Sequence, residues 1–396
     1  MKRGASVIEY GVVLGLIGLV SMTAASSFGR QLADLFSSTG KVFSEARAAL
    51  ASSAGDDIEP IPFIIEVSTD EATIYPMAGG SIQVDWGDPT ANSNCGQSFS
   101  AGASITCAYP AVSTYLISIS GNMKAYGSPA GATTNHAITR VVQWGNTGLT
   151  NLNAAFHTAE NLIDVPDDFP STVTSVENLF RRASTLNDPS IALWDVSNVA
   201  NFSHMFGDAT TFNVDISGWD VSSGLNMPAV FLNAENFNQD IGGWDVSSAT
   251  NMQSLFRGAT AFSYDLNSWD VSNVQNMQSI FRESAYNGDI SNWDTEAVTN
   301  FRYAFQGNSG FDQNISGWNV SNVVYFNNMF QSATGFSQDI TGWDVSSATE
   351  MDYMFWNTYA FTEDLSGWCV SGILSSPTGF SSGSSMAAEP IWGSCP

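Results

Sequence analysis

Tryptophan recurs with a nearly fixed period through the second half of the chain. The spacings between consecutive members are 25, 25, 25, 24, 25, 25 and 25 residues, for Trp194, Trp219, Trp244, Trp269, Trp293, Trp318, Trp343 and Trp368. A period in the twenties is typical of a solenoid, in which each repeat is one coil stacked on the previous one. Burying one tryptophan removes roughly 200 Å² from water, which a single coil cannot do alone. We therefore predict a stack of coils with the tryptophans in its core.

The repeat consensus also predicts local structure within each coil. Ile/Leu-x-x-Trp-x-Val has the spacing of the strand segment in leucine-rich repeats, so Trp-Asp-Val is predicted to be a short strand of a parallel sheet. The run from Asn251 to Phe256 places apolar residues at i, i+3 and i+4, which predicts a short helical turn on the other side of the coil.

An acidic residue follows the tryptophan in most repeats, on the face of the predicted strand opposite to it: Asp195, Asp220, Asp245, Asp270, Asp294 and Asp344. In stacked strands these carboxylates would lie about 4.8 Å apart and repel one another. One hypothesis is a ladder of oxygen ligands for Ca²⁺. The alternative, which we favour, is that each Asp accepts backbone amides in a turn, so that no cofactor is needed.

The repeat motif resembles a known family. Residues 237–252 read Phe-Asn-Gln-Asp-Ile-x-Gly-Trp-Asp-Val-Ser-x-x-x-Asn-Met. This motif resembles the surface-protein repeat of bacterial lipoproteins, which is related to BspA-like leucine-rich repeats. The resemblance implies a cell-surface solenoid with a binding face, and it names no ligand.

Charge and composition exclude several functions. The net charge is −26, from 38 Asp and Glu against 12 Lys and Arg, which argues against nucleic acid as a partner. The three histidines are isolated, and no Gly-x-Ser-x-Gly motif or phosphate loop is present. The arginines do not recur at one repeat position. We therefore predict that the protein is not an enzyme.

The four cysteines fall into two local pairs, Cys95 with Cys107 and Cys369 with Cys395. Local pairs without a metal-ligand spacing predict disulfides in an exported chain. The second pair would fasten the C-terminal tail to the last coil.

Residues 63–121 change to a period of two with β-branched residues, which predicts strands of a small β-sandwich. The run Asp85-Trp86-Gly87-Asp88 resembles the core motif of PKD-type domains, although Pro89 replaces the usual glycine. We expect Asp85 and Asp88 to be turn residues rather than cation ligands.

The N-terminus combines a basic start, Met-Lys-Arg-Gly4, with Glu9 and Tyr10 ahead of an apolar run over residues 11–25. This pattern resembles the type IV pilins of the Flp (Tad) class over roughly residues 1–45. The resemblance implies cleavage by prepilin peptidase between Gly4 and Ala5, with Glu9 and Tyr10 serving filament assembly. Glu9 could pair with the new amine of Ala5 in an apolar filament core. The alternative is that Glu9 is only a helix-start residue.

These observations predict an α+β multidomain protein with a leader over 1–4, a long pilin helix over 5–48 and a linker over 49–61. A PKD-like β-sandwich over 62–135 and a leucine-rich-repeat-like parallel β solenoid with a C-terminal cap over 136–396 would follow. The predicted function is a structural subunit of a Flp-type pilus that displays a repeat module for adhesion or interaction. A minor adhesive pilin and a membrane-anchored surface adhesin that does not polymerise are the alternatives.

The predicted partners are other copies through the N-terminal helix, prepilin peptidase, a surface or glycan ligand, and no nucleic acid. The predicted location is the bacterial inner membrane for the precursor and then the extracellular pilus or cell surface.

Overall fold

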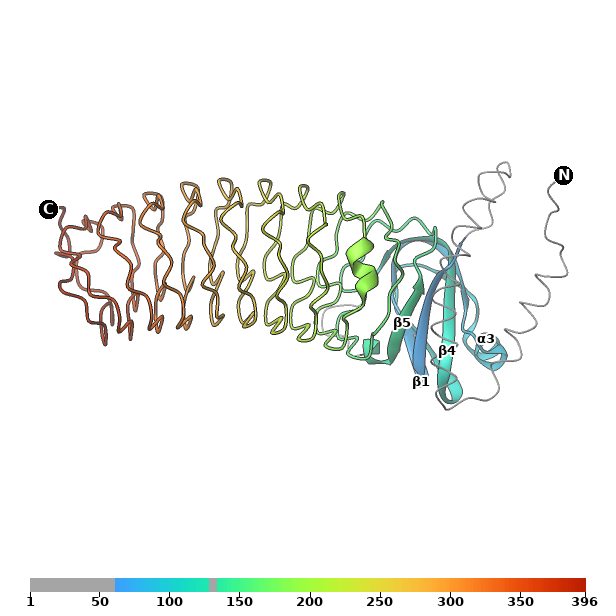
Figure 1. Cartoon of the computed structure of the whole chain (residues 1–396). Coiled ribbons are helices and arrows are strands. Elements are labelled where there is room, and N and C mark those ends of the chain that lie inside the picture. The colour runs from blue at the N-terminus through green and yellow to red at the C-terminus, as the bar shows by residue number, and fades with distance from the viewer. Residues whose placement is uncertain (1–60, 128–133) are drawn as a thin grey trace, which may run out of the picture. The chain divides into compact units, whose positions relative to one another are not determined.

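The computed structural model describes residues 61–127 and 134–396, which form one antiparallel sheet followed by a row of coils (Figure 1). The sheet has five strands in the order β3-β2-β4-β1-β5. The elements in chain order are β1 (Phe63–Ile74), β2 (Pro76–Asp85), α3 (Pro89–Cys95), β3 (Ser98–Ser100), β4 (Ile105–Tyr126), the 3₁₀ helix η1 (Thr134–Ala137), β5 (Ile138–Gln143) and the 3₁₀ helix η2 (Pro189–Leu193).

The sheet follows from the alternating pattern of its strands. Phe63, Ile65 and Val67 of β1 are buried while the residues between them are partly exposed. The central strand β1 pairs with both β4 and β5, with Phe63 opposite Ile119. The predicted β-sandwich is wrong, because the strands form one sheet rather than two. Coils supply the second layer that the apolar face of a sheet requires, and the ring of Tyr126 lies 6.2 Å from that of Phe156.

In the segment 85–88, which resembled a PKD motif, side-chain hydrogen bonds to the backbone determine the turn. Asp88 is the N-cap of α3, and its Oδ1 accepts the backbone N–H of Thr90 at 2.8 Å. Asp85 Oδ1 accepts the N–H of Gly87 at 2.9 Å. Gly87 has φ +75°, and a Cβ there would lie 2.5 Å from the carbonyl oxygen of Leu116. Both carboxylates therefore shape the turn into α3.

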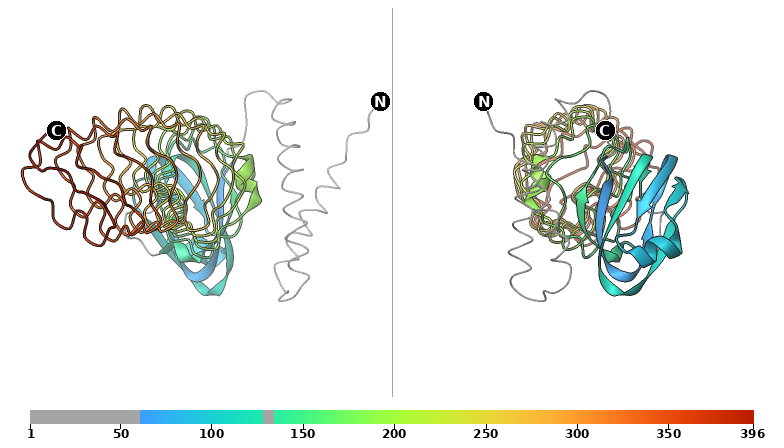
Figure 2. Two further views of the ribbon diagram at one scale, coloured as in Figure 1. Left: turned by 60° about the vertical axis from the view of Figure 1, so that its left-hand side comes forward. Right: turned by 90° about the vertical axis from the view of Figure 1, so that its right-hand side faces the viewer.

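The sheet continues directly into the coils. Ala125 of β4 forms a parallel bridge with Asn151, and Arg140 of β5 forms another with Asp164. From Asn151 to Tyr325, one residue per coil bridges to the equivalent residue of the next coil, and the series ends at Glu350. Viewed nearly along the row, successive coils superpose (Figure 2, right). We name each coil by its bridging residue: Asn151, Ser175, Asn201, Asn226, Asn251, Asn276, Asn300, Tyr325 and Glu350.

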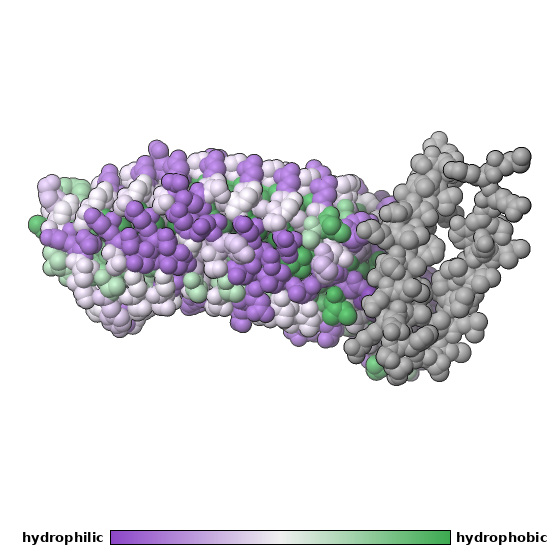
Figure 3. All heavy atoms as spheres, viewed as in Figure 1, coloured by the Kyte–Doolittle hydropathy of each residue, from purple (hydrophilic) through white to green (hydrophobic). Residues whose placement is uncertain are grey.

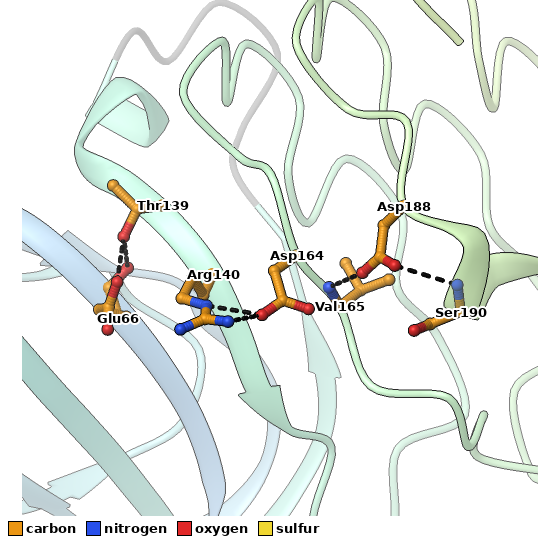
Figure 4. A network of polar contacts seen from close by, with 7 residues as sticks. All are labelled: Glu66, Thr139, Arg140, Asp164, Val165, Asp188 and Ser190. Carbon is orange, nitrogen blue, oxygen red and sulfur yellow. Dashed lines mark hydrogen bonds and ion pairs between the residues drawn. The ribbon is translucent and has the colours of Figure 1, made fainter. Parts of the chain in front are cut away.

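A polar network marks the junction of the sheet and the first coils (Figure 4). The guanidinium of Arg140 forms an ion pair with the carboxylate of Asp164, with Nε 2.6 Å from Oδ2. The carboxylate of Asp188 accepts the N–H groups of Val165 at 2.7 Å and Ser190 at 3.0 Å. Burial raises the pKa of Asp164, and Asp188 adds to the rise while Arg140 opposes it. Arg140 therefore compensates part of the charge where two acidic residues meet.

The bridging residue lies in a segment where the sequence predicted a helical turn. In the Asn251 coil, alternate N–H groups donate to carbonyls of the next coil, for example Ser254 to Gln278 at 2.8 Å and Phe256 to Ile280 at 2.9 Å. The N–H of Leu255 instead donates to the carbonyl three residues back, on Met252, at 3.2 Å. The predicted strand at Trp-Asp-Val is wrong: these residues lie between two turns, and the ladder runs through the asparagines instead.

This alternation depends on left-handed residues at two fixed positions. The third and seventh residues after the bridging residue have positive φ in every coil, as at Ser254 (φ 57°) and Gly258 (φ 70°). A left-handed residue reverses the direction of the next peptide group. One N–H can therefore point to the next coil while its neighbour points back into its own turn. Most of these positions hold residues other than glycine, namely Ala154, Thr158, Asn178, Arg182, His204, Asp208, Ala229, Asn233, Ser254, Ser279, Glu283, Tyr303, Asn328, Ser332, Tyr353 and Asn357.

The bridging asparagine satisfies groups that a turn leaves open. Asn276 Oδ1 accepts the N–H of Gln278 at 3.1 Å, and Asn276 Nδ2 donates to Gln253 Oε1 of the previous coil at 3.2 Å. One side chain thus caps its own turn and contacts the previous coil.

The core of the coils is a set of aromatic columns. Trp244 is 5% exposed, and its Nε1–H donates to the carbonyl of Ile216 in the previous coil at 3.1 Å. The rings of Phe231 and Phe237 stack at 3.9 Å within one coil, and those of Phe231 and Phe256 stack at 5.6 Å between coils. The tryptophans therefore lie in the core, as their period predicts.

The predicted fold class needs correction. Among the described residues the only α-helix is α3, and the regular strands form a mostly antiparallel sheet. The coils contribute parallel bridges of single residues rather than a parallel β-sheet. The expected helix over 5–48 lies outside the described residues.

Candidate functional site: the ladder face

The outer side of the bridged segments forms one continuous surface, which we call the ladder face. It consists of the side chains at the second, third, sixth and seventh positions after each bridging residue. The first, fourth, fifth and eighth positions turn into the core, as Phe301, Ala304, Phe305 and Asn308 do in the Asn300 coil. The positions between them face outward and are mostly partly or fully exposed, as for Arg302, Tyr303, Gln306 and Gly307, although small residues there, such as Ala229 and Ser279, are buried.

Every basic residue beyond Arg140 lies on the ladder face: Arg181, Arg182, Arg257, Arg282 and Arg302. They occupy the second, sixth and seventh positions, so the sequence period did not group them. The structure groups them because all three positions point outward from the same bridged segment. The rest of the coil surface has no basic residue to offset its acidic side chains.

The N-terminal part of the ladder face is an ion-pair cluster around Asp208. Arg181 Nε lies 3.5 Å and Arg182 Nε 3.8 Å from Asp208 Oδ2. Asn233 Nδ2 donates to Asp208 Oδ1 at 2.8 Å. The Arg182 side chain is 54% exposed, so it can reach a partner without breaking the fold.

Two histidines border this cluster. Burial lowers the pKa of His157 and of His204, and the nearby Arg181 lowers both further. The Nδ1 atom of His204 is buried and has no hydrogen-bond partner. Both rings are therefore neutral near pH 7 and titrate below the usual histidine range.

Pairs also cross from coil to coil in the middle of the ladder face. Arg257 Nη2 lies 3.4 Å from Glu283 Oε2, and Arg282 Nη2 lies 3.0 Å from Glu283 Oε1. These side chains are at least a quarter exposed, so the pairs contribute little to stability.

The C-terminal part of the ladder face adds aromatic rings. The guanidinium of Arg302 lies 3.9 Å from the ring centroid of Tyr325, donates to Asn327 Oδ1 at 3.2 Å and pairs with Glu350. The guanidinium of Arg282 lies 5.3 Å from the ring centroid of Tyr303. Stacking on aromatic rings is a recognised use of arginine in binding surfaces.

The predicted acidic row lies outside the ladder face and serves turns. Asp245 Oδ1 accepts the backbone N–H of Ser247 at 3.0 Å and its hydroxyl at 2.6 Å, and these bonds lower the pKa of Asp245. The same bond to the N–H two residues on is made by Asp195, Asp220, Asp270, Asp294 and Asp344. Within residues 61–127 and 134–396, no group of three or more His, Cys, Asp or Glu is arranged to hold a metal ion. Ca²⁺ binding stays a hypothesis.

Both predicted disulfides are present, between Cys95 and Cys107 and between Cys369 and Cys395. The first joins the end of α3 to β4, and the second fastens the tail to the last coil. On the face drawn in Figure 3, hydrophilic residues predominate along the coils and hydrophobic residues form only small separate groups.

The family model described as "Mycoplasma protein of unknown function, DUF285" matches residues 130–224, 150–263, 174–287 and 283–391. Together these overlapping matches span more than half of the 396-residue chain, so the chain belongs to this family. A search of curated proteins and a search of solved structures found no match.

This assignment corrects the resemblances drawn from motifs. The comparisons support a repeat family of unknown function in place of the Flp pilin, PKD-type and BspA-like identifications. The BspA-like resemblance misled because a coil of fixed length imposes similar aromatic spacing on different repeat families.

The membrane and pilus predictions are also corrected. None of the helices in residues 61–127 and 134–396 combines the length and the apolar character that a membrane crossing requires. The expected inner-membrane precursor, transmembrane helix and pilin identity therefore have no support. Gly4, Ala5, Glu9 and Tyr10 lie outside the described residues.

Proposed function

We propose that this protein is a non-enzymatic binding scaffold that recognises a partner through its ladder face. The pilus role depended on the pilin resemblance and is not carried further. The part of the prediction that remains is a repeat module that serves adhesion or interaction.

The observation that carries this proposal is the contrast between the two kinds of coil surface. The turns outside the ladder face repeat Asp/Asn–Ser hydrogen bonds whose role is local, as for Asp220 with Ser222. The ladder face instead varies from coil to coil and gathers the five arginines and both histidines of the coils. The fold requires only left-handed backbone at two of these positions, and it does not require charged or aromatic side chains there. Variable side chains on a rigid repeated frame are typical of repeat proteins that bind partners.

The disulfides support a function in an oxidising compartment. Both pairs are formed, and no described cysteine is free. Structural disulfides persist outside the reducing cytosol, where a scaffold of this kind would meet cells or surfaces.

The test is binding of the purified, fluorescently labelled full chain to intact bacterial and cultured animal cells, measured by flow cytometry. A ladder-face variant combines Arg182→Ala, Arg257→Ala, Tyr353→Ala and Trp356→Ala. A control variant combines Tyr264→Ala and Ser223→Ala, which lie outside the ladder face. We expect saturable binding that the ladder-face variant loses and the control keeps. Absence of saturable binding, or equal binding by both variants, would contradict the proposal.

A further inference from the structure

We propose that the C-terminal part of the ladder face, in the Asn300, Tyr325 and Glu350 coils, binds a neutral glycan by stacking sugar rings on Tyr353, Trp356 and Tyr303. This inference rests on the proposed binding role of the ladder face and names the ligand class and the site.

The aromatic residues of the ladder face are confined to these coils. Tyr303 is the third residue of the Asn300 coil, and Tyr353 and Trp356 are the third and sixth of the Glu350 coil. From Asn151 to the end of the Asn276 coil, no outward position of the ladder face holds Phe, Tyr or Trp. Elsewhere in the coils most aromatic rings lie in the core, and the exposed Tyr264 and Tyr359 lie outside the ladder face, so the outward rings of the ladder face form a separate group.

Two of the three rings stand at positions that disfavour them. Tyr303 (φ 59°) and Tyr353 (φ 56°) are left-handed, a conformation that bulky residues rarely adopt. Other coils place Ala, Asn or Ser at the same position, as at Ala229, Asn328 and Ser254. A strained choice that recurs two coils apart indicates a function outside the fold itself.

The neighbouring coil makes room for one of these rings. Gly379 occupies the equivalent left-handed position after Tyr353, with φ +63°. A Cβ at Gly379 would lie 2.6 Å from Cδ1 of Tyr353 and 2.7 Å from Cε1. The Tyr353 ring therefore lies over the glycine, and the residue still exposes 38% of its surface. This support fixes the ring while leaving area free for a ligand.

The spacing of the rings suits an extended glycan. Tyr303 and Tyr353 occupy the same position two coils apart, which separates them by roughly 10 Å along the row. That separation is comparable with the length of a disaccharide, so alternate sugars of one chain can meet the two rings. Trp356, whose backbone N–H donates to the carbonyl of Tyr353 at 3.2 Å, is partly exposed and adds a second outward ring in the same coil.

Planar amides lie between the rings. Gln306 Nε2 and Asn328 Nδ2 both donate to Gln331 Oε1. Amides donate and accept hydrogen bonds, as sugar hydroxyls do.

The local charge selects a neutral ligand. The guanidinium of Arg282, which lies 5.3 Å from the ring centroid of Tyr303, is paired with Glu283, and that of Arg302 is paired with Glu350. Asp352 adds a further carboxylate, whose Oδ1 accepts the N–H of Thr378 at 2.6 Å. With a whole-chain charge of −26, sulfated or uronate-bearing glycans are repelled. A lipid surface is also a poor match, because polar amides separate the rings.

The test applies the full chain to a printed array of neutral oligosaccharides, including glucan, mannan, galactan and chitin fragments, with sulfated and uronate-bearing chains on the same array. The strongest neutral oligosaccharide is then titrated by calorimetry. We expect Tyr353→Ala and Trp356→Ala each to weaken binding by up to about tenfold. Tyr353→Phe keeps the ring and should bind like the parent. Tyr264→Ala is the matched control, because Tyr264 is 42% exposed outside the ladder face. Melting curves that match the parent show that each variant is folded.

Three outcomes would overturn the inference: binding of acidic oligosaccharides alone, equal weakening by Tyr264→Ala, or no neutral oligosaccharide bound. If the array is silent but the ladder-face variant still loses binding to cells, the scaffold proposal stands and the glycan inference fails, which indicates a protein partner. If neither the array nor cells are bound, both proposals fail.

Discussion

The five-stranded sheet and the coils bury the same kinds of side chain but satisfy their backbones by different means. In the sheet, hydrogen bonds join strands distant in sequence, as for β1 and β4, where Phe63 is opposite Ile119. In the coils, each bonded partner lies one repeat away, and one bridging residue per coil is supplemented by left-handed turns. Because contacts in the coils are local and repeated, one coil can unfold while distant coils stay folded. In the sheet, each strand needs its neighbours, so the loss of one strand destabilises the others. Damage in the two regions should therefore spread differently.

The largest expected effect comes from removing a core tryptophan in each region. Trp269→Ala leaves a cavity and removes the Nε1 bond to the carbonyl of Ile241, 3.0 Å away. We expect a loss of about 3–5 kcal/mol in the free energy of unfolding, measured by denaturant titration. Hydrogen exchange should show lost protection in the neighbouring coils only. Trp86→Ala in the sheet should instead expose all five strands, and equal spreading in the two variants would refute the comparison.

The next effect concerns the two disulfides. The Cys369–Cys395 bond closes a separation of 26 residues, and Cys95–Cys107 closes one of 12. Replacing the cysteines of either pair by serine should cost about 2–4 kcal/mol, more for the longer loop. Loss of the Cys369–Cys395 bond should expose only the C-terminal tail to proteolysis, because this bond joins the last coil to that tail. Cleavage within the sheet of the Cys369→Ser, Cys395→Ser variant would show that the regions are coupled.

The same substitution, serine to valine, should destabilise the coils but not the sheet. Ser254 is left-handed, so Ser254→Val should cost about 1–2 kcal/mol by placing a β-branched side chain at positive φ. Ser113 lies exposed in β4, where Ser113→Val should be neutral or slightly stabilising. Ser254→Asn is the control, because Asn178 and Asn328 occupy the same position in other coils. The melting temperatures of the three variants test this prediction. An unchanged melting temperature for Ser254→Val would contradict the claim that the left-handed backbone at this position disfavours β-branched side chains.

Acid should weaken the coils through His204. Burial lowers the pKa of His204 in the folded state, so the unfolded chain binds the proton more readily. The resulting stability is present above pH of about 6.5 and is lost as pH falls through the lower folded pKa. His204→Asn removes this titration and suits the left-handed position, so its melting temperature should fall less between pH 7 and 5. If the melting temperatures of the parent and of His204→Asn fall equally with pH, a group other than His204 causes the acid sensitivity.

The smallest effect is expected from chelation. Each Asp that follows a tryptophan already accepts the N–H two residues on, and Asn319 does the same with Ser321 at 3.1 Å without a charge. EDTA should therefore shift the melting temperature by less than about 2 °C, and Asp245→Asn should melt like the parent. A clear fall with EDTA that Ca²⁺ reverses would establish the acidic row as an ion site.

The sequence predicted the features that repeat or alternate. The tryptophan period indicated stacked coils with buried rings, and the period of two indicated the strands around Phe63 and Ile119. The cysteine spacing predicted both disulfides. These features depend on local pattern and on the need to bury apolar area, which a sequence displays directly.

Other features had no signal in the pattern. The backbone ladder passes through Asn251 and its equivalents rather than through Trp-Asp-Val, although both segments carry regular spacing. Left-handed positions are filled by residues as different as Arg182, Glu283 and Tyr353. In the coils from Asn151 to Glu350 glycine occupies only two of them, Gly258 and Gly307, so glycine spacing does not reveal them. β5, which the domain prediction placed in the solenoid, is the fifth strand of the sheet. In these places the need to satisfy backbone hydrogen bonds between coils determines the local conformation, even where the intrinsic preference of the residue favours another conformation.

The candidate site shows the same division. The sequence by itself determined a stack of coils with an aromatic core and an acidic surface, because period and composition fix what must be buried and what can remain in water. Only the tertiary structure brought the five arginines, two histidines and the outward rings onto one face. They occupy different positions of the repeat, and these positions share a face only because left-handed residues turn the bridged backbone twice in each coil.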